Sequence, residues 1–200
     1  MTREEEANEL INIIIHGRGG QGGVTASQII AEAAFNSGKF TDVHAYPSFG
    51  AERRGAPVQA FAKLSKKEVI WDRAQIEHPD IVIVLDETII TPQIVKSINN
   101  NGIMIINTNK DPQYFIDNFE LNDGVKIIVA DVSQLAMTHD LIVEGILVVN
   151  VPILGLLTKA IPEISMSDLK AIVLKYFGEI IGKKNIELME KSLEIMRISG

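Results

Sequence analysis

Cysteine is absent from the 200-residue sequence. Without thiols the chain cannot form a disulfide, use a cysteine nucleophile, or supply the cysteine ligands of a zinc site or an iron–sulfur cluster. Basic residues are also comparatively few, since 19 Lys and Arg stand against 26 Asp and Glu and give a formal net charge of -7. That balance argues against a general nucleic-acid-binding protein, which would present a basic face.

The sequence also lacks an uninterrupted apolar run long enough to cross a bilayer. Its longest apolar-rich stretch, residues 141–157, is broken by a glutamate, a glycine, an asparagine and a proline. The N-terminus carries Glu4-Glu5-Glu6 where a signal peptide needs lysine or arginine, and it has no small-residue cleavage site. These observations predict a cytoplasmic protein without a membrane partner.

Strand-like and helix-like segments alternate along the first 140 residues. Apolar or alternating runs predict strands at 10–16, 43–46, 58–64, 68–71, 81–85, 103–107 and 125–130, and helical spacing predicts helices at 23–37, 91–99 and 131–140. The turn-like residues 65–67 predict that 58–64 and 68–71 form a hairpin, so that the sheet is mixed. Beyond Pro152 the pattern predicts helices at 153–160, 166–177 and 184–198.

These elements predict one α/β domain over residues 1–200, a length that supports a single hydrophobic core. The sheet core, residues 10–150, should be a three-layer, Rossmann-like arrangement around a mostly parallel, mixed sheet. The remaining residues, 151–200, should form C-terminal helices that pack on this core.

A glycine loop separates the first predicted strand from the first predicted helix. It reads Gly17-Arg18-Gly19-Gly20-Gln21-Gly22-Gly23. The glycines remove the Cβ atoms that would hold a phosphate or another backbone at a distance, and the helix that follows adds unpaired N–H donors and the positive end of its dipole. The loop therefore suits an anionic ligand or a closely packed partner. A third interpretation is that the glycines only permit a tight turn and helix–strand contact.

This loop partly matches two nucleotide-binding patterns. Gly17-x-Gly19-x-x-Gly22 matches the dinucleotide fingerprint, but that fingerprint needs an acid at the end of the second strand. Here the second strand ends in Tyr46-Pro47, and Asp42 stands at its beginning, which disfavours NAD and FAD. The P-loop pattern also fails, because Gly23-Val24 occupies the place of its lysine and hydroxyl residue.

A second loop, residues 46–57, follows the second predicted strand. Because ligands of open α/β sheets bind at the carboxyl edge, we expect the two loops to face one another there. Its candidate ligand-binding residues are Ser48, Phe49 as an apolar anchor, and Arg53 and Arg54, whose guanidinium groups can hold a phosphate or carboxylate. The alternative is a solvated loop with a local ion pair to Glu52.

The sequence predicts no catalytic or metal-binding constellation. The four histidines are scattered without a second pair of ligand-type residues, and Ser27 and Ser48 have no obvious triad partners. Asp86-Glu87 follows a buried strand at the same sheet edge. These carboxylates either bound the ligand pocket or cap a helix near Thr88, and capping is the favoured interpretation.

Two long motifs, residues 17–26 and 47–57, together resemble the gamma subunit of 2-oxoacid:ferredoxin oxidoreductases, and the pyruvate type most of all. A third segment, residues 150–160, is similar to a further family segment, so that the resemblance covers nearly the whole chain from about residue 11. In this family pyruvate, coenzyme A and oxidised ferredoxin give acetyl-CoA, carbon dioxide and reduced ferredoxin. Thiamine diphosphate is held by the alpha and beta subunits, and iron–sulfur clusters by the beta and delta subunits.

The resemblance implies a subunit that is catalytically inert alone and that binds coenzyme A and contacts the alpha, beta and delta subunits, serving ferredoxin only through the complex. Coenzyme A carries a pyrophosphate and a 3′-phosphate, which suit a glycine loop and paired arginines. The implied ligand-binding residues are Gly17, Arg18, Gly19, Gly20, Gln21, Gly22, Gly23, Ser48, Phe49, Arg53 and Arg54. Two alternatives stay open: a stand-alone Rossmann-type NAD or FAD oxidoreductase, and a purely structural subunit whose loops are contact surfaces.

Overall fold

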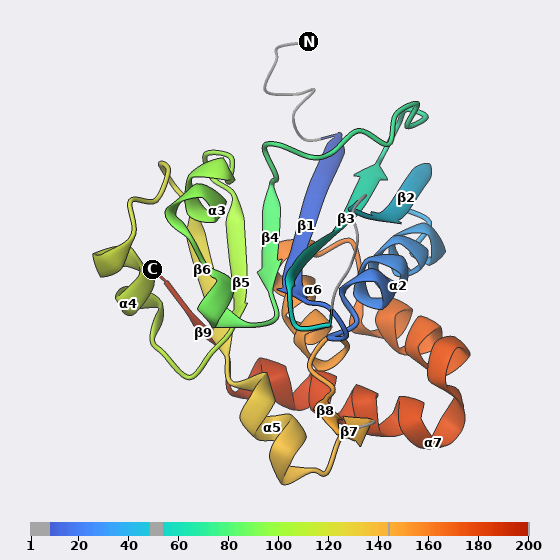
Figure 1. Cartoon of the computed structure of the whole chain (residues 1–200). Helices are drawn as coiled ribbons and strands as arrows, with labels where there is room; N and C mark the ends of the chain where they lie inside the picture. The colour runs from blue at the N-terminus through green and yellow to red at the C-terminus, as the bar shows by residue number, and fades with distance from the viewer. Residues whose placement is uncertain (1–8, 49–53, 144, 200) are drawn as a thin grey trace.

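A seven-stranded sheet runs through the molecule with helices on both faces, in the order β2-β3-β1-β4-β5-β6-β9 (Figure 1). The computed structural model describes residues 9–48, 54–143 and 145–199. The sheet strands are β1 (Leu10–Arg18), β2 (Asp42–Pro47), β3 (Pro57–Ser65), β4 (Ile81–Val84), β5 (Ile103–Asn107), β6 (Lys126–Ala130) and β9 (Arg197–Ile198). The helices are α2 (Gly23–Asn36), η1 (Glu87–Ile89), α3 (Pro92–Ser97), α4 (Pro112–Asn118), α5 (Val132–Thr138), η2 (Pro152–Leu156), α6 (Leu157–Ala160) and α7 (Met166–Glu194).

The sheet is mostly parallel and mixed, as the sequence predicts. Strands β1, β4, β5 and β6 are parallel, whereas β3 lies between β1 and β2 and is antiparallel to both. The predicted hairpin between 58–64 and 68–71 is wrong, because β1 and β2 occupy both edges of β3 and 68–71 forms no strand. That segment is tied to β2 through the Ile70 N–H, which donates to Asp42 Oδ2 at 2.7 Å.

The central strands are buried on both faces, which explains their continuous apolar runs. In β4, Ile81 and Ile83 face the cluster that contains α2, η2, α6 and α7, while Val82 and Val84 face the cluster that contains α3 and α4. Figure 1 shows α2 and α7 packed together on one side of the sheet and α3 and α4 on the other. The predicted three-layer architecture is confirmed.

The C-terminal segment differs most from its prediction. Helix α7 begins at a capping box of Ser165 and Asp168 and contains a break at Gly178, which has a φ of 68°. The predicted helix 184–198 is wrong at its end, because residues 197–198 form β9, antiparallel to β6. Helix α4 and the small hairpin of β7 (Ile142–Val143) and β8 (Ile146–Leu147) were not predicted. Although α7 has 29 residues, no described helix is long and apolar enough to cross a membrane.

Candidate functional site

The glycine loop lies where the chain connections reverse direction. From β1 the chain passes through α2 to β2 on one side, while β4 leads to β5 on the other side. The crevice outside the carboxyl ends of two such strands is the usual ligand site of an open α/β sheet. Gly17 to Gly23 surround the end of β1, and Asp86 follows the end of β4. Both therefore stand at the expected ligand edge.

Packing requires two of these glycines. Gly22 is the N-cap of α2, with a φ of 76°, and a Cβ built on it would lie 2.4 Å from Asn150 Nδ2. That same Nδ2 donates to the Gly22 carbonyl at 3.1 Å, so the third motif of the sequence contacts the first. A Cβ at Gly17 would lie 3.1 Å from Leu85 Cδ1. Close packing against Asn150 thus accounts for Gly22, and close packing against Leu85 disfavours a side chain at Gly17.

The two candidate loops meet, as the sequence predicts. The Gly19 N–H donates to the Ala56 carbonyl at 2.9 Å, and the Gly55 N–H donates to the Gly19 carbonyl at 3.1 Å. Gly19 and Arg54 form an isolated parallel bridge. A cavity of about 240 Å³ lies beside this junction, and its lining includes Gly17, Gly19, Gly20, Gly22, Gly23 and Gln59. The first turn of α2 opens beside it.

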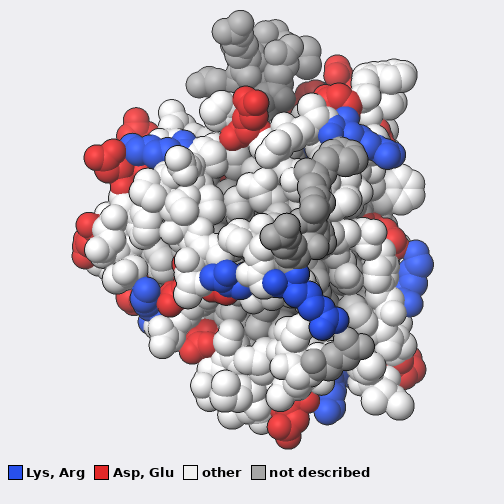
Figure 2. Space-filling view, in the orientation of Figure 1, with Lys and Arg blue, Asp and Glu red and all other residues white. Residues whose placement is uncertain are grey.

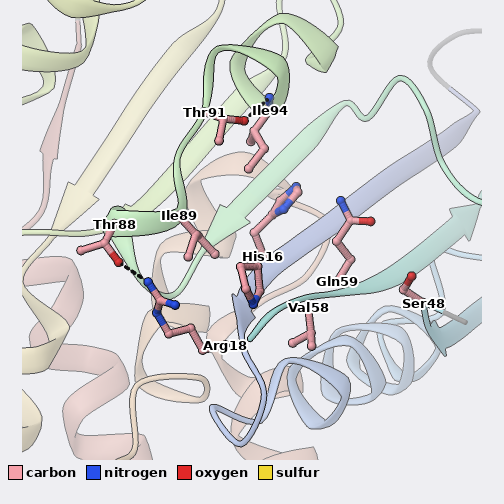
Figure 3. A pocket seen from close by; sticks show the side chains of 10 residues that line it. His16, Arg18, Ser48, Val58, Gln59, Thr88, Ile89, Thr91 and Ile94 are labelled. Atoms are coloured by element: carbon pink, nitrogen blue, oxygen red, sulfur yellow. Dashed lines mark hydrogen bonds between the residues drawn. The ribbon is translucent and has the colours of Figure 1, made fainter. Parts of the chain in front are cut away.

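Arg18 connects three segments of this edge rather than pointing freely into solvent. Its Nε donates to Asp86 Oδ2 at 2.7 Å, its Nη1 to the Gly55 carbonyl at 3.0 Å, and its Nη2 to Thr88 Oγ1 at 2.7 Å (Figure 3). A guanidinium has five N–H donors, so two of them have no acceptor within residues 9–48, 54–143 and 145–199. Asp86 also caps η1 by accepting from the Thr88 N–H at 3.0 Å, which confirms the capping interpretation.

The contacts with Arg18 and Thr88 also keep the carboxylate of Asp86 ionised. Burial raises the pKa of Asp86, but hydrogen bonds from Thr88 and Arg18 together with the charge of Arg18 outweigh it and hold the pKa below its usual value. Asp86 and Arg18 therefore form a charged pair at neutral pH, with side chains 21% and 35% exposed. The pair brings the loops after β1 and β4 together.

The remaining predicted residues fall in different places. Arg54 is exposed at the junction with Gly19, and basic side chains lie in a row across the middle of this face (Figure 2). Ser48 lines a second, larger cavity. Phe49 and Arg53 lie outside the described residues. Asp42, the acid considered for a dinucleotide ribose, lies at the opposite edge of the sheet, where it accepts from the Ile70 N–H.

The larger cavity, of about 550 Å³, contains a residue that sequence reasoning missed. We call it the His16 cavity; it is lined by His16, Arg18, Ser48, Pro57, Val58, Gln59, Thr88, Ile89, Thr91 and Ile94. His16 is only 4% exposed, and its Nε2 has no hydrogen-bond partner among the described residues. Burial lowers the pKa of His16 to about 4, so the ring is neutral at physiological pH. The sequence signal was a polar residue that directly follows a buried strand run and precedes the glycine loop.

Together the fold and the site define a Rossmann-like α/β domain with a glycine loop and an arginine-bearing loop joined at its ligand edge. Within the described residues no group of three or more His, Asp or Glu side chains is placed to hold a metal ion. The chain belongs to the pyruvate ferredoxin/flavodoxin oxidoreductase family, whose model matches residues 12–195. It is a gamma-type subunit of this class of oxidoreductase, which confirms the resemblance found in the sequence.

Relatives of similar length support this assignment. The pyruvate synthase subunit PorC of Thermotoga maritima is 36% identical over 187 residues, covering 94% of this chain and 93% of the relative. The pyruvate/ketoisovalerate oxidoreductases common subunit gamma of Thermococcus kodakarensis is 36% identical over 184 residues, covering 92% and 95%.

Solved structures show the same fold. The crystal structure of the Thermotoga maritima PorC subunit matches with a TM-score of 0.79 and 32% identity, covering 96% of this chain and 99% of that one. A 2-oxoglutarate:ferredoxin oxidoreductase from Magnetococcus marinus matches with a TM-score of 0.71 at 21% identity, covering 94% of this chain but 31% of that one. The second likeness is one of fold alone.

Proposed function

We propose that this chain is the gamma subunit of a pyruvate-type 2-oxoacid:ferredoxin oxidoreductase and that it binds coenzyme A within the complex. The names of the relatives from Thermotoga maritima and Thermococcus kodakarensis support pyruvate, or pyruvate together with ketoisovalerate, as the oxidised substrate. Thiamine diphosphate and the iron–sulfur clusters belong to the alpha, beta and delta partners in this proposal. A chain without cysteine suits that division, since protein-held clusters need thiolate ligands.

The junction of Arg54 with Gly19 carries the coenzyme A part of the proposal. It brings Arg54, an exposed residue, next to Gly19, which lines the cavity at the N-terminus of α2, a helix of 14 residues. First-turn N–H groups and a guanidinium are suited to the pyrophosphate and the 3′-phosphate. Arg18 adds the two N–H donors that lack an acceptor in the described part of the chain. The proposed phosphate-binding residues are Arg18, Gly19, Gly20, Gln21, Gly23, Arg53 and Arg54. Ser48 and Phe49 belong to the arginine-bearing loop and complete the proposed site, and Gly17 and Gly22 shape the glycine loop.

The assembled oxidoreductase provides the test. We expect Arg54→Ala to raise the KM for coenzyme A about tenfold, equivalent to about 1.4 kcal/mol, with little change in kcat. The effect should shrink as salt rises, because an exposed guanidinium–phosphate contact is screened. Lys39→Ala, which removes an exposed cation in the loop between α2 and β2, is the matched control and should leave the KM unchanged.

The interface alternative predicts a different result for the same variant. If Arg54→Ala leaves the KM for coenzyme A unchanged but weakens assembly in size-exclusion chromatography, the arginine loop is a subunit contact and the coenzyme A proposal fails. Calorimetric titration of coenzyme A and NAD into the purified chain separates the dehydrogenase alternative, since that alternative requires saturable NAD binding.

A further inference from the structure

The His16 cavity and the glycine-loop cavity share part of their lining. Arg18, Val58 and Gln59 line both. The smaller cavity has glycine amides and a helix N-terminus, whereas the larger lies over the opposite face of β1, on the side of α3 (Figure 3). A ligand that extends well beyond its phosphate groups can therefore occupy both cavities at once, with Arg18 between its two parts.

The interior of the His16 cavity suits an uncharged ligand that forms hydrogen bonds. His16 is neutral, and its Nε2 lacks a partner within the described chain. Gln59 accepts from Gln75 Nε2 at 3.3 Å through its Oε1, and its NH₂ group has no acceptor among the described residues. The Thr91 hydroxyl caps α3 at one wall. Among the described lining residues Arg18 is the one cation, and it is already paired with Asp86.

Four apolar side chains line the cavity beside these groups and the hydroxyls of Ser48 and Thr88. They are Pro57, Val58, Ile89 and Ile94. Figure 3 shows the His16 side chain in the midst of the lining residues, with Gln59 on one side and Ile89 on the other. A neutral imidazole supplies one donor or one acceptor at each nitrogen, according to its tautomer. A lining of neutral polar groups and apolar side chains suits an uncharged ligand in which amide groups alternate with apolar segments. It is less suited to a charged ligand.

We propose that the His16 cavity binds the pantetheine arm of coenzyme A, with His16 and Gln59 hydrogen-bonded to its amide groups. This inference rests on the proposed coenzyme A function and extends it from the phosphates to the arm. Pantetheine is uncharged and carries two amides, a hydroxyl and a branched dimethyl carbon, which match the polar and apolar parts of the lining. Arg18 stands at the boundary, so the phosphates lie toward the glycine loop and the thiol end lies toward α3.

The buried Nε2 explains why a ligand is expected there. A buried polar atom without a partner destabilises the protein, and most such atoms in native proteins are satisfied. Nε2 is almost wholly covered in the free chain, so the lining must shift slightly before an amide group of the bound arm supplies the missing partner. His16 is in this view a binding residue for coenzyme A and takes no part in the chemistry.

Two ligands distinguish the arm from the phosphates in the assembled enzyme. Coenzyme A is assayed through its KM, and adenosine 3′,5′-bisphosphate, which has no arm, through its Ki as a competitive inhibitor. We expect His16→Leu to raise the KM for coenzyme A about five- to tenfold and to leave the Ki unchanged. His16→Gln keeps a neutral hydrogen-bonding group and should stay within about twofold of the wild type.

Gln59→Leu provides a second, independent variant in case His16→Leu does not fold. It should raise the KM for coenzyme A by a clearly larger factor than the Ki, since Gln59 also lines the smaller cavity. Arg54→Ala, in contrast, should raise both constants, because both ligands carry phosphates.

The outcomes separate this inference from the function on which it rests. If both leucine variants leave the KM for coenzyme A unchanged while Arg54→Ala raises it, the arm lies elsewhere and the phosphate proposal stands. If a leucine variant raises the KM and the Ki equally, it acts on the phosphate loop and the inference is overturned. If Arg54→Ala changes neither constant, the proposed function itself fails.

Discussion

Burial of the His16 imidazole links the stability of the protein to pH. The native pKa of about 4 lies below the ordinary value of 6.5, so the unfolded chain binds a proton that the native state does not. The contribution of His16 to the free energy of unfolding is therefore fully present above pH 6.5 and is lost as the pH falls from 6.5 toward 4. We expect His16 to account for a loss of roughly 3 kcal/mol over that interval.

Urea unfolding of the purified wild type and of His16→Gln, at several pH values between about 4.5 and 7, measures this loss. The variant cannot take up the proton and should lose less stability than the wild type. Because both proteins share every other titrating group, the difference between them isolates His16. Parallel pH profiles would show that the unfolded and native states protonate this residue alike.

Gly22 and Gly38 form a matched pair that separates backbone strain from packing. Both have positive φ, 76° and 68°, but a Cβ at Gly22 meets Asn150 whereas nothing lies within 4 Å of one at Gly38. Gly38→Ala should cost about 1 kcal/mol for its left-handed backbone alone. Gly22→Ala should cost about 2–3 kcal/mol, since displacement of Asn150 adds to the same strain.

Chemical denaturation of the two alanine variants gives the comparison directly. When Asn150→Ala is added to Gly22→Ala, the loss of stability caused by the clash should be recovered. The loss caused by the left-handed backbone should remain. Equal losses for Gly22→Ala and Gly38→Ala would mean that Asn150 moves aside freely, and that the contact between the first and third motifs contributes nothing.

The three loops at the carboxyl edge are connected through Arg18. Its bonds reach Asp86, the Gly55 carbonyl and Thr88, which belong to segments 37 to 70 residues away in sequence. Arg18→Met keeps the aliphatic stem, and Asp86→Asn keeps a side chain that can cap η1. Each should lower the free energy of unfolding by about 1–2 kcal/mol, because a partly exposed, charge-assisted network is lost.

A double-mutant cycle checks that the two side chains act together. The Arg18→Met/Asp86→Asn protein should be less destabilised than the sum of the single variants, with a coupling energy of about 1 kcal/mol. Lys183→Met breaks an exposed pair with Glu179 on α7 and should cause no measurable change, which controls for simple loss of charge. Additive single losses would show that Arg18 and Asp86 stabilise the edge independently.

The elements that were predicted correctly are those whose sequence pattern and tertiary environment agree. Strands such as 103–107 are buried on both faces, and their apolar runs leave little doubt. Helix α2 and the meeting of the two loops followed from the strand–glycine–helix order and from the carboxyl-edge rule. The start of α3 was predicted correctly, because Thr91 can cap the helix and Pro92 suits its first position.

The errors arise where long-range pairing decides the structure. Residues 68–71 look like a strand, but both edges of β3 are filled by segments far away in the chain. Arg197 leaves the helical pattern because its Nη2 donates to the Asn109 and Lys110 carbonyls while β9 pairs with β6. His16 was missed as a cavity residue, since only the tertiary structure brings Ile89 and Ile94 over it.

The whole chain depends on residues that follow position 150. Tyr176 and Lys175 of α7 donate to the Glu32 carboxylate of α2 at 2.6 Å each. The same face of the sheet is covered by buried side chains of the last segment, including Leu154, Leu157, Leu169, Val173 and Met189. Removal of this layer would expose the side of α2 that faces α7 and the part of this sheet face that α2 does not cover.

We therefore expect the chain to unfold as one unit and the fragment 1–150 not to fold. Far-UV and near-UV circular dichroism should report coincident transitions for the full chain, and the fragment should show no near-UV signal and no cooperative transition. Tryptophan emission is a poor monitor here, because the single Trp71 is 91% exposed in the native state. The fragment 1–196 is the matched control: it loses only β9 and should unfold cooperatively at a lower midpoint, since β6 then becomes an unpaired edge. Two separate transitions in the full chain, or a folded 1–150 fragment, would instead make the C-terminal helices an independent unit, and the single-domain prediction would be wrong.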